Sequence, residues 1–422
     1  MIDVNSLTGA RTYTRPPAPD LTPAQRVLLD QEWPVFSDAE IARRRTAIEA
    51  AMADADVEYL LIYGAGGRGT AVPWLTGWSV TTEVICIVSK GAQDSLFIQY
   101  FNHVPFAERL VGTTADVNWG GASTIRTAMG EIERRGGKGK RVGVMGPLPF
   151  GPANALGEMA SDIVNMNGAY TKMRMVKSAE ELDWFRIGAA LSDLAVDALL
   201  TELRPGLTEH DLGDIIEHAY VPWGGRTGIH FLGVTSMAAP DLYVPQQFTS
   251  NNVVQAGDVV FTEITASFFD YSGQVLRSIA VDCEPTPVYR ELHDVAEAAF
   301  DAICAVAKPG GHCQELIEAG KLIEQAAFIH CDDLIHGYGG GYLPPVLGLP
   351  SRRDEPTPDI TLEAGMMMVV QPNVTTLDKT AGIQTGECVV VTEGGAVSIH
   401  RAPRGFLQVG SGHFSDGADD GG

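Results

Sequence analysis

The chain of 422 residues carries 30 Lys and Arg against 53 Asp and Glu, a formal net charge of −23 at pH 7. This surplus disfavours nucleic acid and anionic membrane surfaces as partners, because both attract positive charge. No window of about 18 apolar residues occurs, so no membrane span is expected. The six cysteines are scattered without a C-x-x-C pair, which predicts reduced thiols and a cytoplasmic location.

Residues 1–36 are expected to form an N-terminal arm, because four prolines fall between positions 16 and 23 and such a stretch is rarely a helix interior. Residues 37–172 are expected to form an α/β domain, since strand patterns alternate with helical ones. The helical patterns cover 38–54, 124–134 and 152–162, and the strand patterns cover 57–63, 83–89, 95–100 and 141–146.

Residues 173–408 alternate long amphipathic helices with isolated β segments, which predicts a second domain of α+β type. Ser178-x-x-Glu181 is a capping-box pattern, in which two side chains satisfy N–H groups at a helix start, and an apolar-periodic run to Leu203 follows it. Residues 409–422 are rich in Gly and Asp and are expected to form a flexible tail.

The second half contains an internal repeat. A basic-Pro-Gly turn joins two helical runs at 203–212 and again at 307–316, and a Gly-led strand follows at 257–263 and again at 365–371. Two halves related by a pseudo-twofold axis, with a cleft between them, are the simplest geometry for this pattern. Glu263 and Gln371 would then occupy equivalent positions in the cleft. Coincidence is the alternative, because such turns are common.

Gly64-x-Gly66-x-x-Gly69 formally matches a dinucleotide-binding fingerprint, but that fingerprint requires a helix to begin there. Pro73 and a turn-like Leu-Thr-Gly segment follow instead. We therefore expect no nicotinamide cofactor, and no other cofactor is indicated.

Several short motifs occur in the order found in one known family, over roughly residues 38–405. They are Val72-Pro-Trp-Leu-Thr-Gly77, Met175-Val-Lys-Ser-Ala-Glu-Glu181, Leu203-Arg-Pro-Gly206, Gln255-Ala-Gly-Asp258, His336-Gly-Tyr-Gly339, Glu363-Ala-Gly365 and Val390-Val-Thr-Glu-Gly394. With them the sequence resembles the M24 "pita-bread" family of aminopeptidase P, prolidase, methionine aminopeptidase and creatinase. The resemblance implies a creatinase-like N-terminal α/β domain, a pita-bread catalytic domain with an internal pseudo-twofold repeat, and a homodimer.

The resemblance also implies where a metal site would lie. The peptidase members hold two metal ions with Asp, Asp, His, Glu and Glu, and the matching positions here are Glu263, Gln274, His336, Gln371 and Gly386. Neutral amides and a glycine cannot offset roughly +4 of metal charge, so we expect a member of the family depleted in metal ligands that binds no metal. Glu387 could replace Gly386 only through a bulge, because adjacent strand residues point to opposite faces.

In creatinase, the metal-free relative, a histidine moves the proton, and the matching position here is Gln246. The sequence therefore departs from creatinase as well. These comparisons predict a metal-independent hydrolase or lyase that cleaves a C–N bond, of amide, lactam, imide or amidine type, in a small polar molecule. The alternatives are an atypical Xaa-Pro-type metallopeptidase and a catalytically silent binding protein on the same fold.

Eight side chains are candidates for the site. Acid–base chemistry is assigned to His336, Glu263 and His230, and substrate binding to Gln246, Gln274, Arg277, Gln371 and Tyr342. Histidine titrates near neutral pH, a buried Glu must be paired or protonated, amides both donate and accept, and Arg binds carboxylates. Structural alternatives stay open: Glu263 and Arg277 could form an ion pair, and His230 could be a satisfied structural group.

Overall fold

The computed structural model describes residues 15–339, 341–353 and 355–410. The first 14 residues of the expected arm and residues 411–422 of the expected tail lie outside this range. The described part of the arm contains a helix, α1 (Pro23–Leu29), which the proline argument did not anticipate. Pro23 stands in the first turn, where its missing N–H costs nothing, and Thr22 and Gln25 form a capping box.

The N-terminal domain contains, among the described residues, a six-stranded sheet in the order β4-β3-β2-β1-β5-β6. Its strands are β1 (Tyr59–Gly64), β2 (Val84–Ser89), β3 (Asp94–Ile98), β4 (Ala115–Trp119), β5 (Arg141–Met145) and β6 (Asp162–Asn165). Its helices are α2 (Asp38–Asp54), α3 (Ala71–Thr76), α4 (Val104–Val111), α5 (Thr124–Arg134), α6 (Phe150–Met159) and α7 (Asn167–Met175). An apolar core lies on each face of the sheet, as an α/β layer arrangement requires.

The C-terminal domain is built on a second sheet, nine-stranded within the described range, whose main path runs β12-β11-β13-β15-β9-β8-β7. The strands are β7 (Arg226–Ser236), β8 (Asp258–Phe268), β9 (Tyr271–Val281), β11 (Ile335–Tyr338), β12 (Tyr342–Leu347), β13 (Met367–Val370), β15 (Gly386–Thr392), β16 (Gly395–Ser398) and β17 (Leu407–Val409), and β10 (Ile329–His330) pairs separately with β14 (Val374–Thr375). The helices are α8 (Ala179–Glu202), α9 (Glu209–Tyr220), α10 (Pro287–Val306), α11 (Cys313–Gly320) and α12 (Leu322–Gln325).

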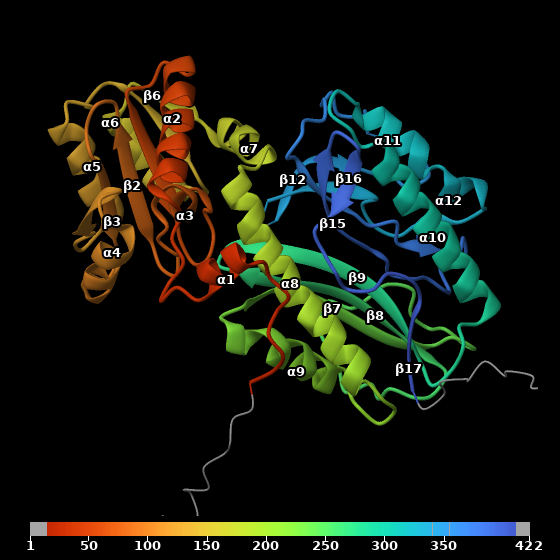
Figure 1. Ribbon diagram of the computed structural model, residues 1–422. Coiled ribbons are helices and arrows are strands. Elements are labelled where there is room, and N and C mark those ends of the chain that lie inside the picture. Colours follow the sequence, from red (N-terminus) through yellow and green to blue (C-terminus); the bar gives the residue numbers. More distant parts are fainter. Residues whose placement is uncertain (1–14, 340, 354, 411–422) are drawn as a thin grey trace, which may run out of the picture.

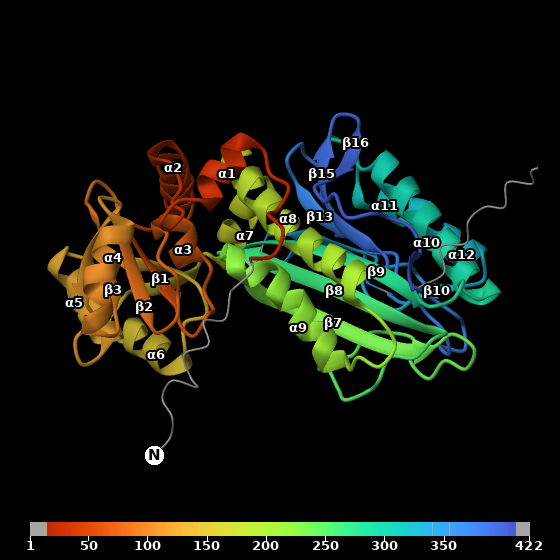
Figure 2. The ribbon, with the colours of Figure 1, turned by 60° about the horizontal axis from the view of Figure 1, so that its bottom comes forward.

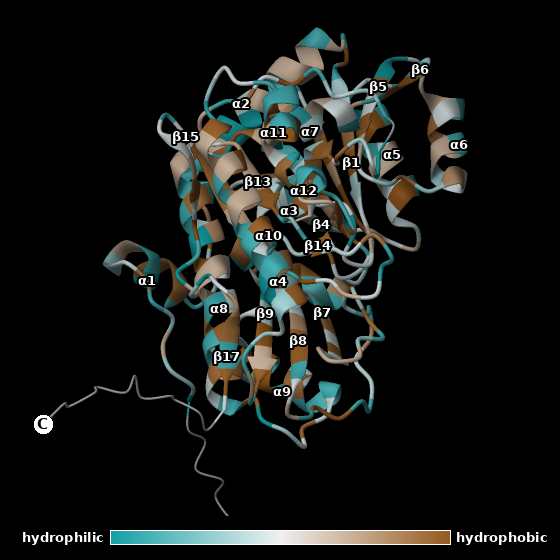
Figure 3. Cartoon of the chain, turned by 90° about the vertical axis from the view of Figure 1, so that its right-hand side faces the viewer, coloured by the Kyte–Doolittle hydropathy of each residue, from teal (hydrophilic) through white to brown (hydrophobic). Residues whose placement is uncertain are grey.

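Helices cover the outer side of this sheet. Figures 1 and 2 show α8 and α9 beside β7, β8 and β9, and α10 and α11 beside the strands of the second half. Each helix pair closes its own apolar core. Figure 3 shows brown, apolar strands behind helices that carry teal, hydrophilic residues. In the described part of the chain, no helix combines the length and the apolar character that crossing a bilayer demands.

The internal repeat is visible in matching hydrogen bonds. The N–H of Gly206 donates to Val254 O (2.9 Å), and the N–H of Gly310 donates to Leu362 O (2.9 Å). Both glycines have positive φ, 93° and 83°, which a side chain would disfavour. The helix that follows each turn starts with a capping box. The predicted pseudo-twofold repeat is therefore confirmed.

A buried charge network joins the two domains. Arg44 on α2 is fully buried and donates to Glu40 Oε1 (2.6 Å), Glu181 Oε1 (3.1 Å) and Tyr271 Oη (3.0 Å). Glu181 belongs to the predicted capping box at the start of α8, which the structure contains. Because the guanidinium of Arg44 and the carboxylates of Glu40 and Glu181 hydrogen-bond to one another, this network can be buried without leaving an unpaired charge.

Candidate active site

The centre of the second sheet brings together three of the predicted side chains. Gln274 on β9 donates from Nε2 to Glu263 Oε1 on β8 (2.9 Å) and to Gln371 Oε1 just beyond β13 (3.1 Å). Gln371 in turn donates from Nε2 to Asp333 O (3.1 Å). The amide groups are thereby held in one orientation around the Glu263 carboxylate. We call Glu263, Gln274 and Gln371 the central cluster.

Strand register explains this meeting. Thr265 lies opposite Gln274 in the β8–β9 ladder, and Glu263 lies opposite Leu276. Facing residues of an antiparallel pair share a face, and every second residue along a strand returns to it. Glu263, Thr265 and Gln274 therefore project from one face. Buried Thr265 Oγ1 has no hydrogen-bond partner among the described residues, so a hydroxyl is left free beside the amide of Gln274.

The electrostatics of Glu263 fit a proton-transfer role. Burial raises its pKa to about 7, because desolvation disfavours the charged form. No cationic side chain pairs with it among the ion pairs of the described residues. Near neutral pH both protonation states of the carboxyl group are therefore populated, so it can accept a proton in one step and return it in the next.

His336 on β11 is fully buried, and its ring stacks parallel to that of Tyr342 with centroids 3.9 Å apart. Its Nδ1 faces Gly337 O (3.2 Å), which places the ring proton on Nδ1 and leaves a lone pair on Nε2. Nε2 finds no partner in the described part of the chain. Burial lowers the pKa of His336 to about 4, so the ring is neutral at pH 7 and serves best as an acceptor. Its role in proton transfer stays a prediction.

The structure does not bring His230 to the central cluster. His230 on β7 lies opposite Ile264, whereas Phe231 lies opposite Glu263, so the histidine occupies the other face. Its Nε2 is 2.6 Å from Tyr220 Oη on α9, and its Nδ1 accepts from the N–H of Thr265 (3.2 Å). The structure therefore places His230 apart from the central cluster, and its catalytic role stays a prediction.

Arg277 is also placed differently from the substrate-binding expectation. It is 2% exposed and donates to Glu387 and to the carbonyl oxygens of Leu276, Gly386, Ala402 and Pro403. Since these acceptors occupy its guanidinium, Arg277 is not free to bind a carboxylate.

The ion-pair partner of Arg277 is therefore Glu387 rather than Glu263. Glu387 lies opposite Val275, one residue out of phase with Gln274, so it points away from the central cluster. It does not replace Gly386 as a possible ligand.

Gln246 is exposed, and its N–H donates to Leu232 O (2.9 Å) beyond the edge strand β7. The structure does not place it with the central cluster, because the segment that carries it extends the outer edge of the sheet. Tyr342 is 59% exposed over His336. Substrate contact by Tyr342 stays a prediction.

Two acidic residues near the cluster were missed in the sequence. Asp332 accepts two hydrogen bonds from Asn373 Nδ2 (3.1 and 2.9 Å), and Asp333 pairs with Arg353 (2.8 Å). The adjacent pair of aspartates four and three residues before His336 was the available signal. Both lie in the turn that leads into β11, so they border the central cluster on the side of Gln371.

The side chains present do not fit the two-metal centre that the family implies. The described residues contain no group of three or more His, Cys, Asp and Glu placed to hold a metal ion. The central cluster offers one carboxylate and two neutral amides, and both N–H groups of Gln274 are donated within it. A pair of divalent ions needs several anionic oxygens, which this donor set does not supply.

The second domain is a pita-bread domain, defined by its curled antiparallel sheet, its repeated helix–turn–helix–strand unit and the central cluster. It follows the α/β domain in the chain. The chain belongs to metallopeptidase family M24, whose model matches residues 183–393. It is 23% identical over 395 residues to an uncharacterized hydrolase/peptidase of Sinorhizobium fredii, covering 88% of this chain and 97% of that one. It is also 23% identical over 271 residues to the Xaa-Pro dipeptidase of Pyrococcus furiosus, covering 63% and 75%.

The solved prolidase of Pyrococcus horikoshii superposes with a TM-score of 0.72 at 18% identity, covering 86% of this chain and all of that one. That likeness shows the fold. Family membership and these relatives support a hydrolase, and they correct one expectation. The prediction of a metal-independent hydrolase of the creatinase-like, non-peptidase type is wrong. The relatives are named as Xaa-Pro dipeptidases and prolidases, and the family is one of metallopeptidases. They favour the alternative of an atypical Xaa-Pro-type metallopeptidase.

Proposed function

We propose that this chain is an atypical Xaa-Pro-type peptidase, which hydrolyses the amide bond before proline in a small peptide at the central cluster. Its relatives suggest the substrate class. The observation that carries the proposal is the largely buried Glu263, whose pKa burial raises to about 7, at the point where both halves of the pita-bread sheet meet. The enzyme is atypical in the amides that surround this carboxylate.

In the proposed reaction the ionised Glu263 takes a proton from water. The water oxygen bonds to the carbonyl carbon, and a tetrahedral intermediate forms. Glu263, now protonated, gives its proton to the proline nitrogen as the C–N bond breaks, and a carboxylic acid and a secondary amine leave. A group with a pKa near the working pH suits both transfers. The carboxyl group ends in the state in which it began.

The side-chain amides of Gln274 and Gln371 orient the substrate for this reaction. Both N–H groups of Gln274 are donated, to Glu263 and to Gln371, so its amide oxygen is left to accept a hydrogen bond from the substrate. Gln371 donates one N–H to Asp333 O and keeps the other. That second N–H can stabilise the developing oxyanion, a contribution worth about 10²–10³ in kcat in well-ordered sites.

The test is proline release from Xaa-Pro dipeptides, with Xaa-Ala dipeptides of the same first residue as the matched control. The assay is run with and without added Mn²⁺ at pH 7.5. We expect release of proline and slower cleavage of the Xaa-Ala series. Absence of proline release under both conditions, with dipeptide binding intact by calorimetry, would identify a binding protein instead.

We further propose that the enzyme is a cytoplasmic homodimer. All six cysteines are free thiols, which supports a reducing compartment. Tyr100, Phe101 and Trp119 are 50%, 69% and 53% exposed near the edge strand β4, and such grouped aromatic surface is typical of contacts between proteins. Light scattering at micromolar concentration is expected to give twice the chain mass of 45.1 kDa, and a monomeric mass would contradict the dimer.

A further inference from the structure

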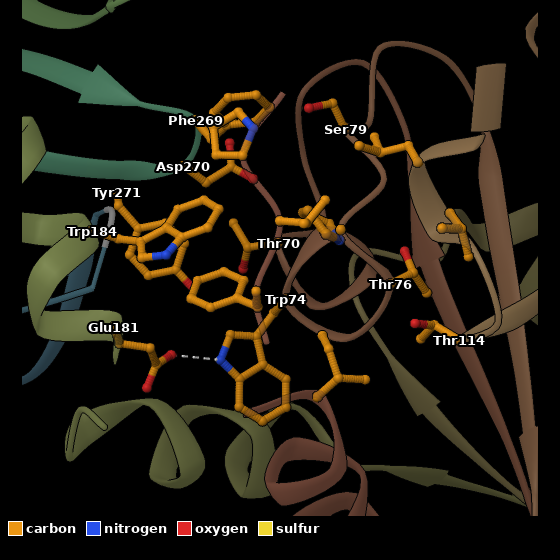
Figure 4. Close-up of a pocket in the computed structure, with 18 of the residues that line it drawn as sticks. Thr70, Trp74, Thr76, Ser79, Thr114, Glu181, Trp184, Phe269, Asp270 and Tyr271 are labelled. Atoms are coloured by element: carbon orange, nitrogen blue, oxygen red, sulfur yellow. Dashed lines mark hydrogen bonds between the residues drawn. The ribbon is translucent and has the colours of Figure 1, made fainter. Parts of the chain in front are cut away.

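A cavity of about 430 Å³ lies between the two domains. It is bounded by the end of the arm, by α3, by the start of α8 and by the β8–β9 turn (Figure 4). The central cluster and His336 are not among the described residues that line it. Its size falls in the range of pockets that enclose small organic ligands, roughly 300–1,000 Å³. It is therefore a second possible site, separate from the proposed catalytic one.

Aromatic rings form one wall of this cavity. Figure 4 shows Trp184, Phe269 and Tyr271 on the C-terminal side and Trp74 below them. The ring centroids of Trp184 and Tyr271 are 5.3 Å apart, and Phe36 from the arm stacks on Trp184 at 3.9 Å. Rigid rings held against one another present flat apolar surface at little entropic cost, and they favour a ligand with a ring of its own.

One buried donor in this wall has no acceptor. Trp184 is 3% exposed, and its indole Nε1–H finds no partner among the described residues. Trp74 differs, because its indole donates to Glu181 Oε1 (3.0 Å; Figure 4). An indole N–H can only donate, and leaving it buried and unpaired is unfavourable. A ligand that accepts a hydrogen bond from Trp184 would remove this cost.

The charges around the cavity favour an anionic acceptor. Glu181 already accepts hydrogen bonds from Arg43, Arg44, Trp74 and the N–H of Ser178. The positive side chains on the wall include Arg174 and Lys177.

The carboxylate of Asp270 lies within electrostatic reach of Arg226 and Arg174. Burial lowers the pKa of Lys177 to about 7, and a nearby anion would favour its charged form. Arg174 donates to Thr70 Oγ1 and Gly339 O, and Lys177 donates to Arg174 O and Met175 O. These two side chains therefore contribute positive charge to the cavity, whereas the indole N–H of Trp184 is the donor that has no partner among the described residues.

We propose that this interdomain cavity binds a small aromatic carboxylate, with its ring against Trp184, Phe269 and Tyr271 and its carboxylate accepting the Trp184 indole hydrogen bond. The site does not depend on the proposed peptidase activity. Phenylacetate is a suitable probe, because it combines one ring with one carboxylate. Phenethylamine, with the same ring and the opposite charge, is the matched comparison.

The experiment is isothermal titration calorimetry of the full chain with both probes. Wild type is expected to bind phenylacetate at least tenfold more tightly than phenethylamine. Trp184→Phe keeps the ring and removes the donor, so it should weaken phenylacetate binding roughly tenfold and leave phenethylamine binding unchanged. Trp223→Phe is the matched control, since its indole nitrogen is also buried without a partner in the described residues but lies outside the cavity.

A second variant locates the binding. Ser79 lines the N-terminal wall, opposite the aromatic one (Figure 4), and Ser79→Phe should fill the cavity and abolish phenylacetate binding. Circular dichroism and thermal melts establish that each variant is folded. The proposal is overturned if wild type does not bind phenylacetate at millimolar concentration, if phenethylamine binds as tightly, or if either cavity variant binds phenylacetate like wild type.

Discussion

Glu263→Gln is expected to lower kcat for a Xaa-Pro dipeptide by about 10²–10⁴-fold, the usual contribution of a positioned acid–base group. Glutamine has the same shape, and its amide oxygen can still accept the hydrogen bond that Gln274 Nε2 makes to Glu263 Oε1. The variant therefore loses the proton carrier and keeps the cluster. Steady-state kinetics should show the loss in kcat with little change in KM, and Glu393→Gln, at an exposed glutamate, should leave both unchanged.

The same residue sets an expected pH dependence. The free enzyme needs ionised Glu263 as the base, so kcat/KM should rise with pH through about 7, the pKa to which burial raises this group. The free energy of unfolding should fall as the pH rises through the same range. A carboxyl group with a raised folded-state pKa stabilises the fold below its ordinary value of 4.5 and loses that contribution as pH rises through about 7.

Glu263→Gln should accordingly unfold at a higher temperature than wild type at pH 8. A pH profile without an inflection near 7, or a folded Glu263→Gln variant that keeps the wild-type kcat, would contradict the assignment of Glu263 as the base.

Local sequence signals defined most of the secondary structure. The predicted helices 38–54 and 124–134 coincide with α2 and α5, and a capping box begins α8 after Ser178. Such helices carry their start signals in consecutive residues. The helix α1 was missed because clustered prolines outweighed the Thr22 cap, although proline is well tolerated in a first turn.

The meeting of Glu263 and Gln371 followed from the repeat, which relates distant strands by symmetry. The repeat does not reveal on which face of the sheet His230 and Arg277 lie. The β7–β8 register shifts between Thr227 and Ile229, and no local pattern reveals such a bulge. The partner of Arg277 is Glu387, 110 residues away in the chain. Long-range pairings of this kind depend on the folded sheet, so the sequence left His230 open to a catalytic role and Arg277 open to a substrate-binding role.

Arg277→Met is expected to be the most destabilising of the substitutions considered, at about 3–5 kcal/mol, because it leaves a buried carboxylate without its counter-charge. Glu387 is 2% exposed. Burial alone would raise its pKa, but the charges of Arg277 and His400 hold that pKa below its ordinary value. Four backbone carbonyl oxygens would lose the same donor. The urea midpoint at pH 7 is the measurement.

Acidification should reduce the difference in unfolding free energy between wild type and Arg277→Met. A carboxylate with a depressed folded-state pKa stabilises the protein above its unfolded pKa, near 4.5, and loses that contribution as pH falls through the folded value. In the variant the unpaired Glu387 becomes protonated more readily, so its penalty falls as the pH approaches 4. The double variant Arg277→Met/Glu387→Leu removes both charges and should recover most of the stability at pH 7, since an apolar pair can replace a buried ion pair at little cost. A double variant as unstable as Arg277→Met would show instead that the carbonyl hydrogen bonds of Arg277, rather than its charge pairing, hold β9 and β15 together.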